Sequence, residues 1–167
     1  VWRVTTPGTS NTFRFRKTYS YNDYNFGSNS DQVIATVTDN GGNSSTANLN
    51  INITKIDNQP PNISSFTTDN TIINLTTEGA NSLKTITFTA VITDNIFLNN
   101  ISLPNTSFVG NVGNTYTYNA IFESNDYSFG STQKIFTLSA TDINNNSSSS
   151  SVTLTINKSD TSGPVIS

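Results

Sequence analysis

The stretch TITFTAVIT (residues 85–93) decides the fold class. Its apolar residues alternate with threonine, which is the period of a β-strand that buries one face and exposes the other. Residues 136–140 and 152–156 repeat this alternation, and turns rich in Asn, Gly and Ser separate such segments. No segment carries the apolar spacing of an amphipathic helix over three turns. The sequence therefore predicts an all-β protein.

Further strands are expected at residues 63–66, 71–75, 99–103, 107–112 and 116–122. Together with the first three segments they make about seven or eight antiparallel strands in a module of about 100 residues. That number of short strands is typical of a Greek-key β-sandwich of the Ig-like kind. We expect Ile86, Phe88, Ala90 and Ile92 to lie on the buried face of their strand, and the threonines to cover its outer face.

The sequence also repeats itself. Shifting the chain by 103 residues aligns residues 11–64 with residues 114–167, and 19 of the 54 pairs are identical without a gap. A repeat of this length predicts tandem Ig-like modules: residues 1–57 form the C-terminal part of one, residues 58–160 a complete one, and residues 161–167 a linker and the start of a third. Proline stiffens both linkers, so consecutive modules are expected nearly end to end. Trp2, the single tryptophan, is expected in the core of the first module.

Composition excludes many kinds of chemistry. Asn, Ser and Thr make up 76 of the 167 residues, and only 11% are charged. The chain has no His, Cys or Met, which excludes imidazole or thiolate catalysis, zinc and iron–sulfur centres and disulfides. A net charge of -3 with eight scattered Lys and Arg gives no surface for nucleic acid, and no apolar run approaches a membrane span. We therefore expect no enzyme, no nucleic-acid partner and no membrane insertion.

Four carboxylates are candidates for a metal site. In the expected topology Asp94 and Asp142 each follow a strand that runs toward the linker of Asp57, and Asp23 of the preceding module lies near the same junction. Carboxylate and amide oxygens without nitrogen or sulfur suit Ca²⁺. Aspartate at the end of a strand also caps turns through its side chain. Both interpretations are open: a calcium site at the junction, or turn-forming residues without a metal.

Two lysines occupy equivalent positions in the repeat. Lys55 and Lys158 share the parity of the inward residues of their strands, which directs them toward the lower end of each core. They are expected to pair with Asp23 and Asp126 respectively. The alternative is an intramolecular isopeptide crosslink from the lysine to an Asp or Asn.

The motifs TAVITDN (residues 89–95), YSFGS (127–131), SATD (139–142) and TLTINKSD (153–160) resemble tandem bacterial Ig-like and cadherin-like repeats. Such repeats occur in large secreted adhesins, surface filaments and phage fibres. The resemblance implies an extracellular, cell-surface or virion-surface spacer whose partners are neighbouring repeats, with any cell-surface or glycan receptor bound by other parts of the full-length protein. It also implies calcium at the linkers, for which Asp57-Asn58 is the matching segment.

A different class of function stays open. The module could be a carbohydrate-binding accessory module of a secreted enzyme, which would display a planar row of aromatic side chains. Tyr116 and Tyr118 lie in one expected strand, but the repeat aligns them with Phe13 and Phe15, which favours a core position.

Overall fold

The computed structural model describes residues 15–78 and 82–164, and it divides the chain into two compact units, Val1–Asp57 and Asn58–Ser167. Trp2 lies outside the described residues, so its expected core position stays a prediction. Residues 161–164 form no helix or strand, and residues 165–167 are not described, so the start of a third module also stays a prediction.

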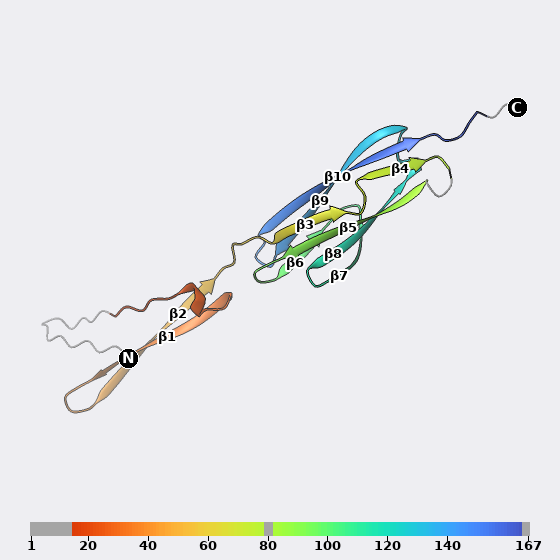
Figure 1. Cartoon of the computed structure of the whole chain (residues 1–167). Coiled ribbons are helices and arrows are strands. Elements are labelled where there is room, and N and C mark those ends of the chain that lie inside the picture. The colour runs from red at the N-terminus through yellow and green to blue at the C-terminus, as the bar shows by residue number, and fades with distance from the viewer. Residues whose placement is uncertain (1–14, 79–81, 165–167) are drawn as a thin grey trace. The chain divides into compact units, whose positions relative to one another are not determined.

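Unit 1, as far as it is described, is a short turn followed by a long β-hairpin (Figure 1). The 3-10 helix η1 spans Tyr21–Asp23, strand β1 spans Gly27–Thr38 and strand β2 spans Ser44–Lys55. The two strands pair antiparallel over their whole length, from Gly27 opposite Lys55 to Thr38 opposite Ser44.

In its described residues, unit 2 contains eight strands and the 3-10 turn η3 (Figure 1). In chain order these are β3 Asn62–Thr68, β4 Ile72–Thr76, β5 Leu83–Thr93, β6 Leu98–Ser102, β7 Ser107–Val112, β8 Thr115–Glu123, η3 Ser124–Asp126, β9 Gly130–Asp142 and β10 Ser147–Ser159. The strands form two four-stranded sheets, with the orders β3-β5-β8-β7 and β4-β10-β9-β6. The chain crosses between the sheets repeatedly, as in a β-sandwich.

The all-β prediction is confirmed, and all eight strand positions expected for this unit contain a strand. The expectation that every strand is antiparallel is wrong for one pair. Strand β4 lies parallel to β10, with Ile72 opposite Thr155 and Thr76 opposite Ser159. The reason is topological: β3 and β4 are consecutive, but they belong to different sheets, so β4 meets the last strand of the unit instead of its neighbour in sequence.

The core lies between the two sheets. Phe88 on β5 and Phe136 on β9 face each other across the layers, with their ring centroids 4.7 Å apart. The alternating residues of the opening motif are all buried, and the largest fully buried side chains of unit 2 are Phe88, Phe122, Leu75, Ile92, Leu138, Leu154, Ile156 and Asp142. Period-two alternation therefore identified the buried face of β5 correctly, because a strand points successive side chains to opposite sides of its sheet.

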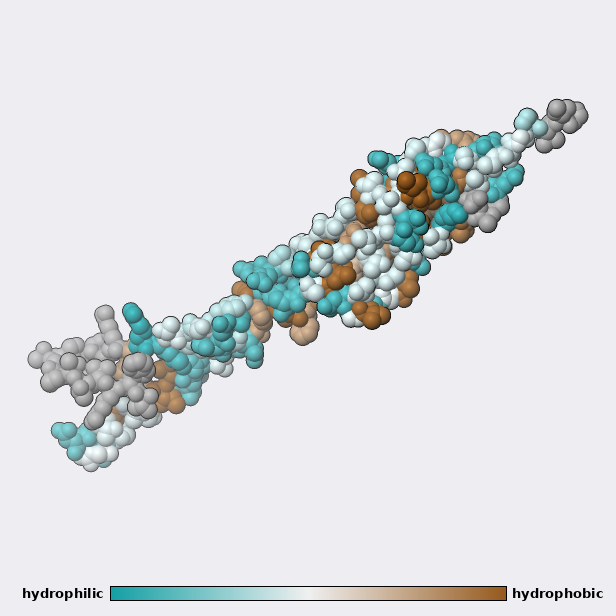
Figure 2. Space-filling view, in the orientation of Figure 1, coloured by the Kyte–Doolittle hydropathy of each residue, from teal (hydrophilic) through white to brown (hydrophobic). Residues whose placement is uncertain are grey.

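The outer faces of the same strands are covered by hydroxyl and amide side chains. Thr85, Thr87 and Thr89 alternate with the buried residues of β5 and are not buried themselves. Figure 2 shows mainly hydrophilic and neutral colours on the visible face of unit 2, interrupted by separate hydrophobic patches. Along β5, threonine side chains thus form most of the outer face.

The segments that are related by the shift of 103 residues have the same secondary structure in both units. The 3-10 turn, first strand and second strand of unit 1 correspond, after a shift of 103 residues, to η3, β9 and β10 of unit 2. The pairing register is also the same in the two units, since Gly27 lies opposite Lys55 and Gly130 lies opposite Lys158.

Both glycines have a positive φ, 96° for Gly27 and 107° for Gly130, at the point where the strand begins. Glycine reaches this conformation without the steric cost that a Cβ would impose.

Candidate metal centre

The centre of the candidate site is the turn that connects β9 to β10. Asp142 is the last residue of β9 and is 0% exposed. Its Oδ1 accepts hydrogen bonds from the backbone N–H groups of Asn144 (2.8 Å) and Asn146 (2.9 Å), and its Oδ2 accepts one from Nδ2 of Asn146 (2.7 Å). The backbone of Asn145 has a φ of 67°, a conformation that Asn tolerates better than most residues. Asp142 therefore holds this turn together with its side chain.

The equivalent turn of unit 1 has the same hydrogen bonds. Oδ1 of Asp39 accepts from the backbone N–H of Asn43 (2.8 Å), and Oδ2 accepts from Nδ2 of Asn43 (2.9 Å). Gly42 has a φ of 86° at the position that corresponds to Asn145. Because the arrangement recurs at Asp39, the hydrogen bonds of Asp142 are explained by turn formation, without a metal.

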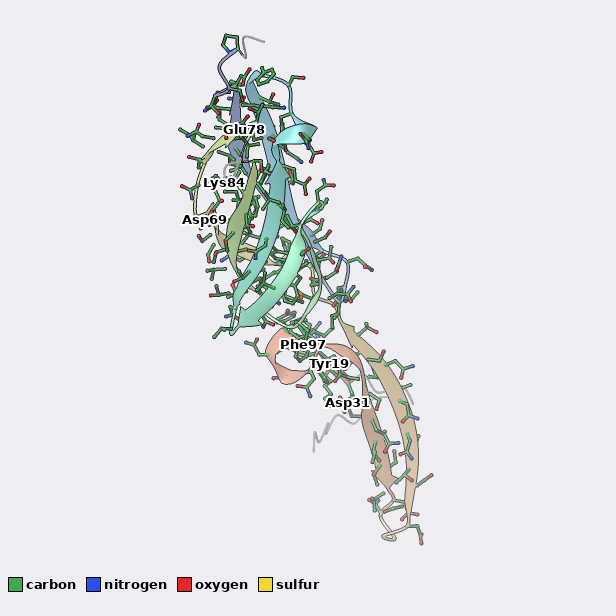
Figure 3. The ribbon with its side chains drawn as sticks, turned by 90° about the vertical axis from the view of Figure 1, so that its right-hand side faces the viewer. Tyr19, Asp31, Asp69, Glu78, Lys84 and Phe97 are labelled. Carbon is green, nitrogen blue, oxygen red and sulfur yellow. The ribbon has the colours of Figure 1, made fainter. Side chains whose placement is uncertain are left out.

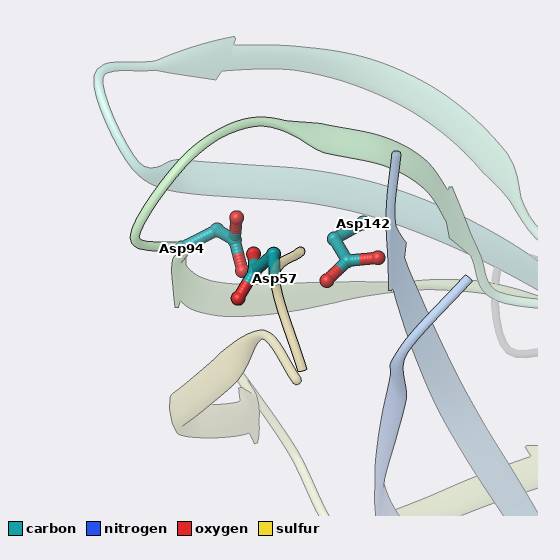
Figure 4. A group of neighbouring side chains, drawn as sticks. All are labelled: Asp57, Asp94 and Asp142. Carbon is teal, nitrogen blue, oxygen red and sulfur yellow. The ribbon is translucent and has the colours of Figure 1, made fainter. Parts of the chain in front are cut away.

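Three of the four predicted carboxylates lie together (Figure 4). One oxygen each from Asp57, Asp94 and Asp142 forms a group in which all the atoms lie within 4.8 Å of one another. Asp57 is the residue immediately before unit 2 and is 3% exposed. Asp94 follows β5, and its Oδ2 accepts a hydrogen bond of 3.0 Å from the backbone N–H of Ile96. We call these three residues the aspartate cluster.

The other carboxylate oxygen of Asp94 distinguishes the aspartate cluster from an ordinary turn. Oδ1 of Asp94 is buried, and no hydrogen-bond donor reaches it in the described part of the chain. A buried carboxylate oxygen without a donor is costly, and a cation would compensate for the missing hydrogen bond. Turn formation does not explain this atom.

Asp23 is not part of the aspartate cluster as found among the described residues. It lies in η1 of unit 1 and is exposed, and its Oδ2 accepts a hydrogen bond of 3.3 Å from the backbone N–H of Ser20. The sequence analysis placed Asp23 at the junction between modules only because of the topology that it assumed. The observed hydrogen bond of Asp23 is to Ser20, three residues earlier in the chain.

The hydrogen bonds control the charge of Asp142. Burial acts to raise the pKa of this carboxyl, but the donors from Asn146, Asn144 and Asn145 together outweigh it, and the net pKa lies below the ordinary value of 3.8. Asp142 is therefore anionic at neutral pH. The cluster brings this anion close to two further carboxyl groups and offers only oxygen ligands, a set that fits a hard cation such as Ca²⁺ better than zinc or copper.

The two repeat lysines have a structural role that the sequence did not identify. Nζ of Lys158 donates a hydrogen bond of 2.8 Å to the carbonyl oxygen of Tyr127 and lies 4.9 Å from the centre of the Phe129 ring. Nζ of Lys55 donates at 3.0 Å to the carbonyl oxygen of Tyr24 and lies 4.5 Å from the Phe26 ring. The expected partners, Asp126 and Asp23, are replaced by backbone carbonyls. The alternation of side chains along the strand predicted the direction of both lysines. It could not predict that each lysine donates to a backbone carbonyl oxygen.

Comparison with known proteins identifies no family for this chain. No protein-family model matches it, and no curated protein gives a significant match. Among the residues that the structure describes, no helix has the length and apolar character needed to cross a membrane.

Proposed function

We propose that this chain is part of a structural and adhesive spacer: a tandem array of Ig-like modules in a long extracellular surface protein or fibre. The observation that carries the proposal is the recurrence of the same turn, strands and register 103 residues apart. Recurrence of a whole supersecondary unit is characteristic of repeat proteins, in which successive units extend the molecule. On this proposal the chain gives rigid reach and attachment and has no catalytic role.

The sheet orders support an Ig-like module for unit 2. In such modules two sheets pack face to face, and strands distant in sequence become neighbours. Here β5 pairs with β8 in one sheet, and β6 pairs with β9 in the other. Each sheet therefore contains neighbouring strands that are not consecutive in the chain. We propose that unit 2 is one complete Greek-key module of this kind.

The parallel pairing of β4 with β10 suits a module under tension. Strand β4 lies near the start of the unit and β10 at its end, and the two run in the same direction. Pulling the ends of the module apart would therefore load the β4–β10 hydrogen bonds along the strand axis, so that many must break together. The backbone bond from Thr155 to Thr71 (2.8 Å) and the side-chain bond from Asn157 to Asn74 (3.0 Å) belong to this region.

We also propose that the aspartate cluster binds Ca²⁺. The three carboxylates, the burial of Asp57 and Asp142 and the unsatisfied oxygen of Asp94 support this. Asp57 immediately precedes unit 2, so a shared cation would connect the linker to the loops that follow β5 and β9 and would stiffen it.

Forced unfolding of single molecules tests the spacer proposal, and the absence of cysteine allows attachment points to be chosen freely. In the double variant N58C/S162C the force reaches β4 through β3, and it pulls the parallel strands β4 and β10 in opposite directions. In the matched control E78C/S162C it acts at the same end of both strands, because the Ser162 hydroxyl lies 2.6 Å from a carboxylate oxygen of Glu78. That geometry opens the hydrogen bonds one at a time.

The spacer proposal requires a mean unfolding force severalfold higher for N58C/S162C than for the control. Equal forces in the two geometries would contradict it. Binding of the chain to a glycan array would support the rival function of a carbohydrate-binding module. Against that rival, Tyr118 is buried and is therefore not displayed for a sugar.

A further inference from the structure

The turn that joins β1 to β2 contains the single Asn-Gly pair of the sequence, Asn40-Gly41 (Figure 1). Every other asparagine is followed by a residue that has a side chain. The main-chain nitrogen of the following residue can attack Cγ of an asparagine, and a side chain on that residue obstructs the attack. Glycine has no Cβ and leaves its nitrogen accessible. Asn40 is therefore the asparagine most susceptible to this reaction.

The fold places this pair at the exposed tip of the turn. Asn40 and Gly41 are both exposed. Two backbone hydrogen bonds close the turn around them, from the N–H of Asp39 to the carbonyl oxygen of Asn43 (2.9 Å) and from the N–H of Gly42 to the carbonyl oxygen of Asp39 (3.1 Å). The N–H of Gly41, which supplies the attacking nitrogen, takes part in neither bond. The backbone pairing of the turn therefore leaves this nitrogen available.

The equivalent turn of unit 2 shows that this position is exposed even where two sheets enclose a core. After the shift of 103 residues, Asn40 and Gly41 correspond to Ile143 and Asn144. Ile143 is 52% exposed, and Asn144 is also exposed. The exposure of Asn40 thus belongs to the turn itself. The turn of unit 2 lacks the reactive pair, because isoleucine has no side-chain amide.

We propose that Asn40 is a deamidation site, at which unit 1 is modified over time without an enzyme. The nitrogen of Gly41 forms a bond to Cγ of Asn40, the proton of its N–H passes to water, and the side-chain nitrogen of Asn40 leaves as ammonia. Water then opens the resulting succinimide ring at either carbonyl. One opening gives aspartate, and the other gives isoaspartate, in which the main chain runs through the former side chain. The inference needs only the turn of the hairpin and does not depend on the spacer proposal.

The turn is built so that the modification weakens it. Isoaspartate adds a methylene to the main chain between Asp39 and Gly41, whereas the carboxylate oxygens of Asp39 must reach Asn43 at 2.8 Å and 2.9 Å. Hydrogen bonds from the Asn43 side chain and from the backbone of the turn hold the pKa of Asp39 below its ordinary value of 3.8, so Asp39 is anionic at neutral pH. Either product places a second negative charge beside it, and like charges repel. Modification therefore opens the turn of unit 1 and leaves the turn of Asp142 intact.

Incubation of the folded chain at mildly alkaline pH, followed by peptide mapping with mass spectrometry, tests the site. The peptide that contains Asn40 should gain aspartate and isoaspartate with time. The peptide that contains Asn144, Asn145 and Asn146 should stay unmodified over the same period. Modification of these three asparagines at the rate of Asn40 would overturn the proposal. No modification of Asn40 in the folded chain, when the chain unfolded in guanidinium is modified there, would also overturn it.

Two variants separate the chemistry from other effects on the turn. G41A adds a methyl group to the residue that supplies the nitrogen, and it should slow the reaction at Asn40 severalfold. Its Cβ would lie 3.3 Å from Oδ1 of Asp39, a contact that a small shift of this side chain relieves. I143N/N144G copies the reactive pair to the turn of unit 2 and should create a second site there at residue 143. An unchanged rate in G41A, or an unreactive residue 143 in I143N/N144G, would contradict the mechanism.

Hydrogen exchange tests the consequence for the turn. In the aged chain the amides of β1 and β2 next to the turn should exchange severalfold faster than before, whereas those of β9 and β10 should keep their rates. Unchanged exchange in β1 and β2 of a fully modified chain would overturn the weakening of the turn. Forced unfolding through N58C/S162C depends only on unit 2, so its result stands apart from this one.

Discussion

Lys158 and Tyr127 are joined by a hydrogen bond of 2.8 Å from the lysine ammonium to the tyrosine carbonyl oxygen. The bond connects the end of β10 to the segment between η3 and β9, 31 residues earlier in the chain. The equivalent bond from Lys55 to Tyr24 spans the same number of residues in unit 1. A contact conserved between two units with different core residues indicates that it stabilises the local hairpin and does not depend on the sheet that covers it.

Replacing Lys158 by methionine tests this contact. K158M keeps most of the aliphatic side chain but leaves the carbonyl oxygen of Tyr127 without its charged donor. Loss of such a hydrogen bond costs about 1–3 kcal/mol. We expect urea unfolding of unit 2 to shift to lower denaturant by this amount, with an unchanged slope. S149A, on the exposed side of β10, should change the free energy of unfolding by less than about 0.5 kcal/mol. Equal stability of K158M and S149A would contradict a stabilising role.

Substitutions at a buried and an exposed position of β9 should differ sharply in their effect on the free energy of unfolding. Leu138 is fully buried, whereas Ile135 is 67% exposed on the other face. L138A should lower the free energy of unfolding by about 2–5 kcal/mol, because it removes buried surface and leaves a cavity. I135T should change it by less than about 0.5 kcal/mol. Chemical denaturation of both variants measures the difference, and similar losses would show that the face assignment is wrong.

Asp142 predicts an acid limit to stability. Its pKa in the folded chain lies below the ordinary value of 3.8, so the folded state holds the proton less tightly than the unfolded state. The resulting stabilisation is fully present above about pH 4 and is lost as the pH falls through the lower, folded pKa. Thermal unfolding between pH 7 and pH 2 should show this loss.

D142N provides the comparison for the acid limit. The variant cannot ionise, so it should have a lower melting temperature at pH 7 and a smaller decrease toward pH 2. A wild-type chain whose melting temperature does not depend on pH in this range would contradict the assignment.

Calcium should stabilise the chain if the aspartate cluster binds it. At a free Ca²⁺ concentration 100 times the Kd, binding to the folded state alone adds about 2.7 kcal/mol. We expect the melting temperature to rise with Ca²⁺ and to return to its original value with a chelator. D94N should weaken this response. D69N, which changes an exposed aspartate after β3 (Figure 3), should retain it. An identical melting curve with Ca²⁺ and with chelator would exclude the metal site.

Much of the local structure followed from the sequence. Thr and apolar residues alternate in β5, and the alternation predicted both the strand and its buried face, because side-chain direction in a strand depends only on position along it. The turn at Asp142 was also predictable, since Asp followed by Asn favours a side-chain-capped turn. The repeat predicted that β1 and β2 resemble β9 and β10, and the pairing registers agree with this.

The candidate site was only partly predictable. Strand direction suggested that Asp94 and Asp142 lie at the same end of the unit as Asp57, and these three do lie together. Asp23 was added by assuming how two modules meet, and no local signal in the sequence could support that step. The acceptor of Lys158 was missed because a backbone carbonyl carries no signature in the sequence.

The sequence by itself determined the all-β character, the positions of the strands and the repeat, because these depend on the properties of residues close together in the chain. Tertiary structure alone decided that β4 pairs parallel with β10, that the oxygen atoms of Asp57, Asp94 and Asp142 approach within 4.8 Å, and that Lys158 reaches Tyr127. These relationships join segments far apart in the chain. Their geometry is fixed only when the two sheets pack around one core, because that packing decides which strands become neighbours.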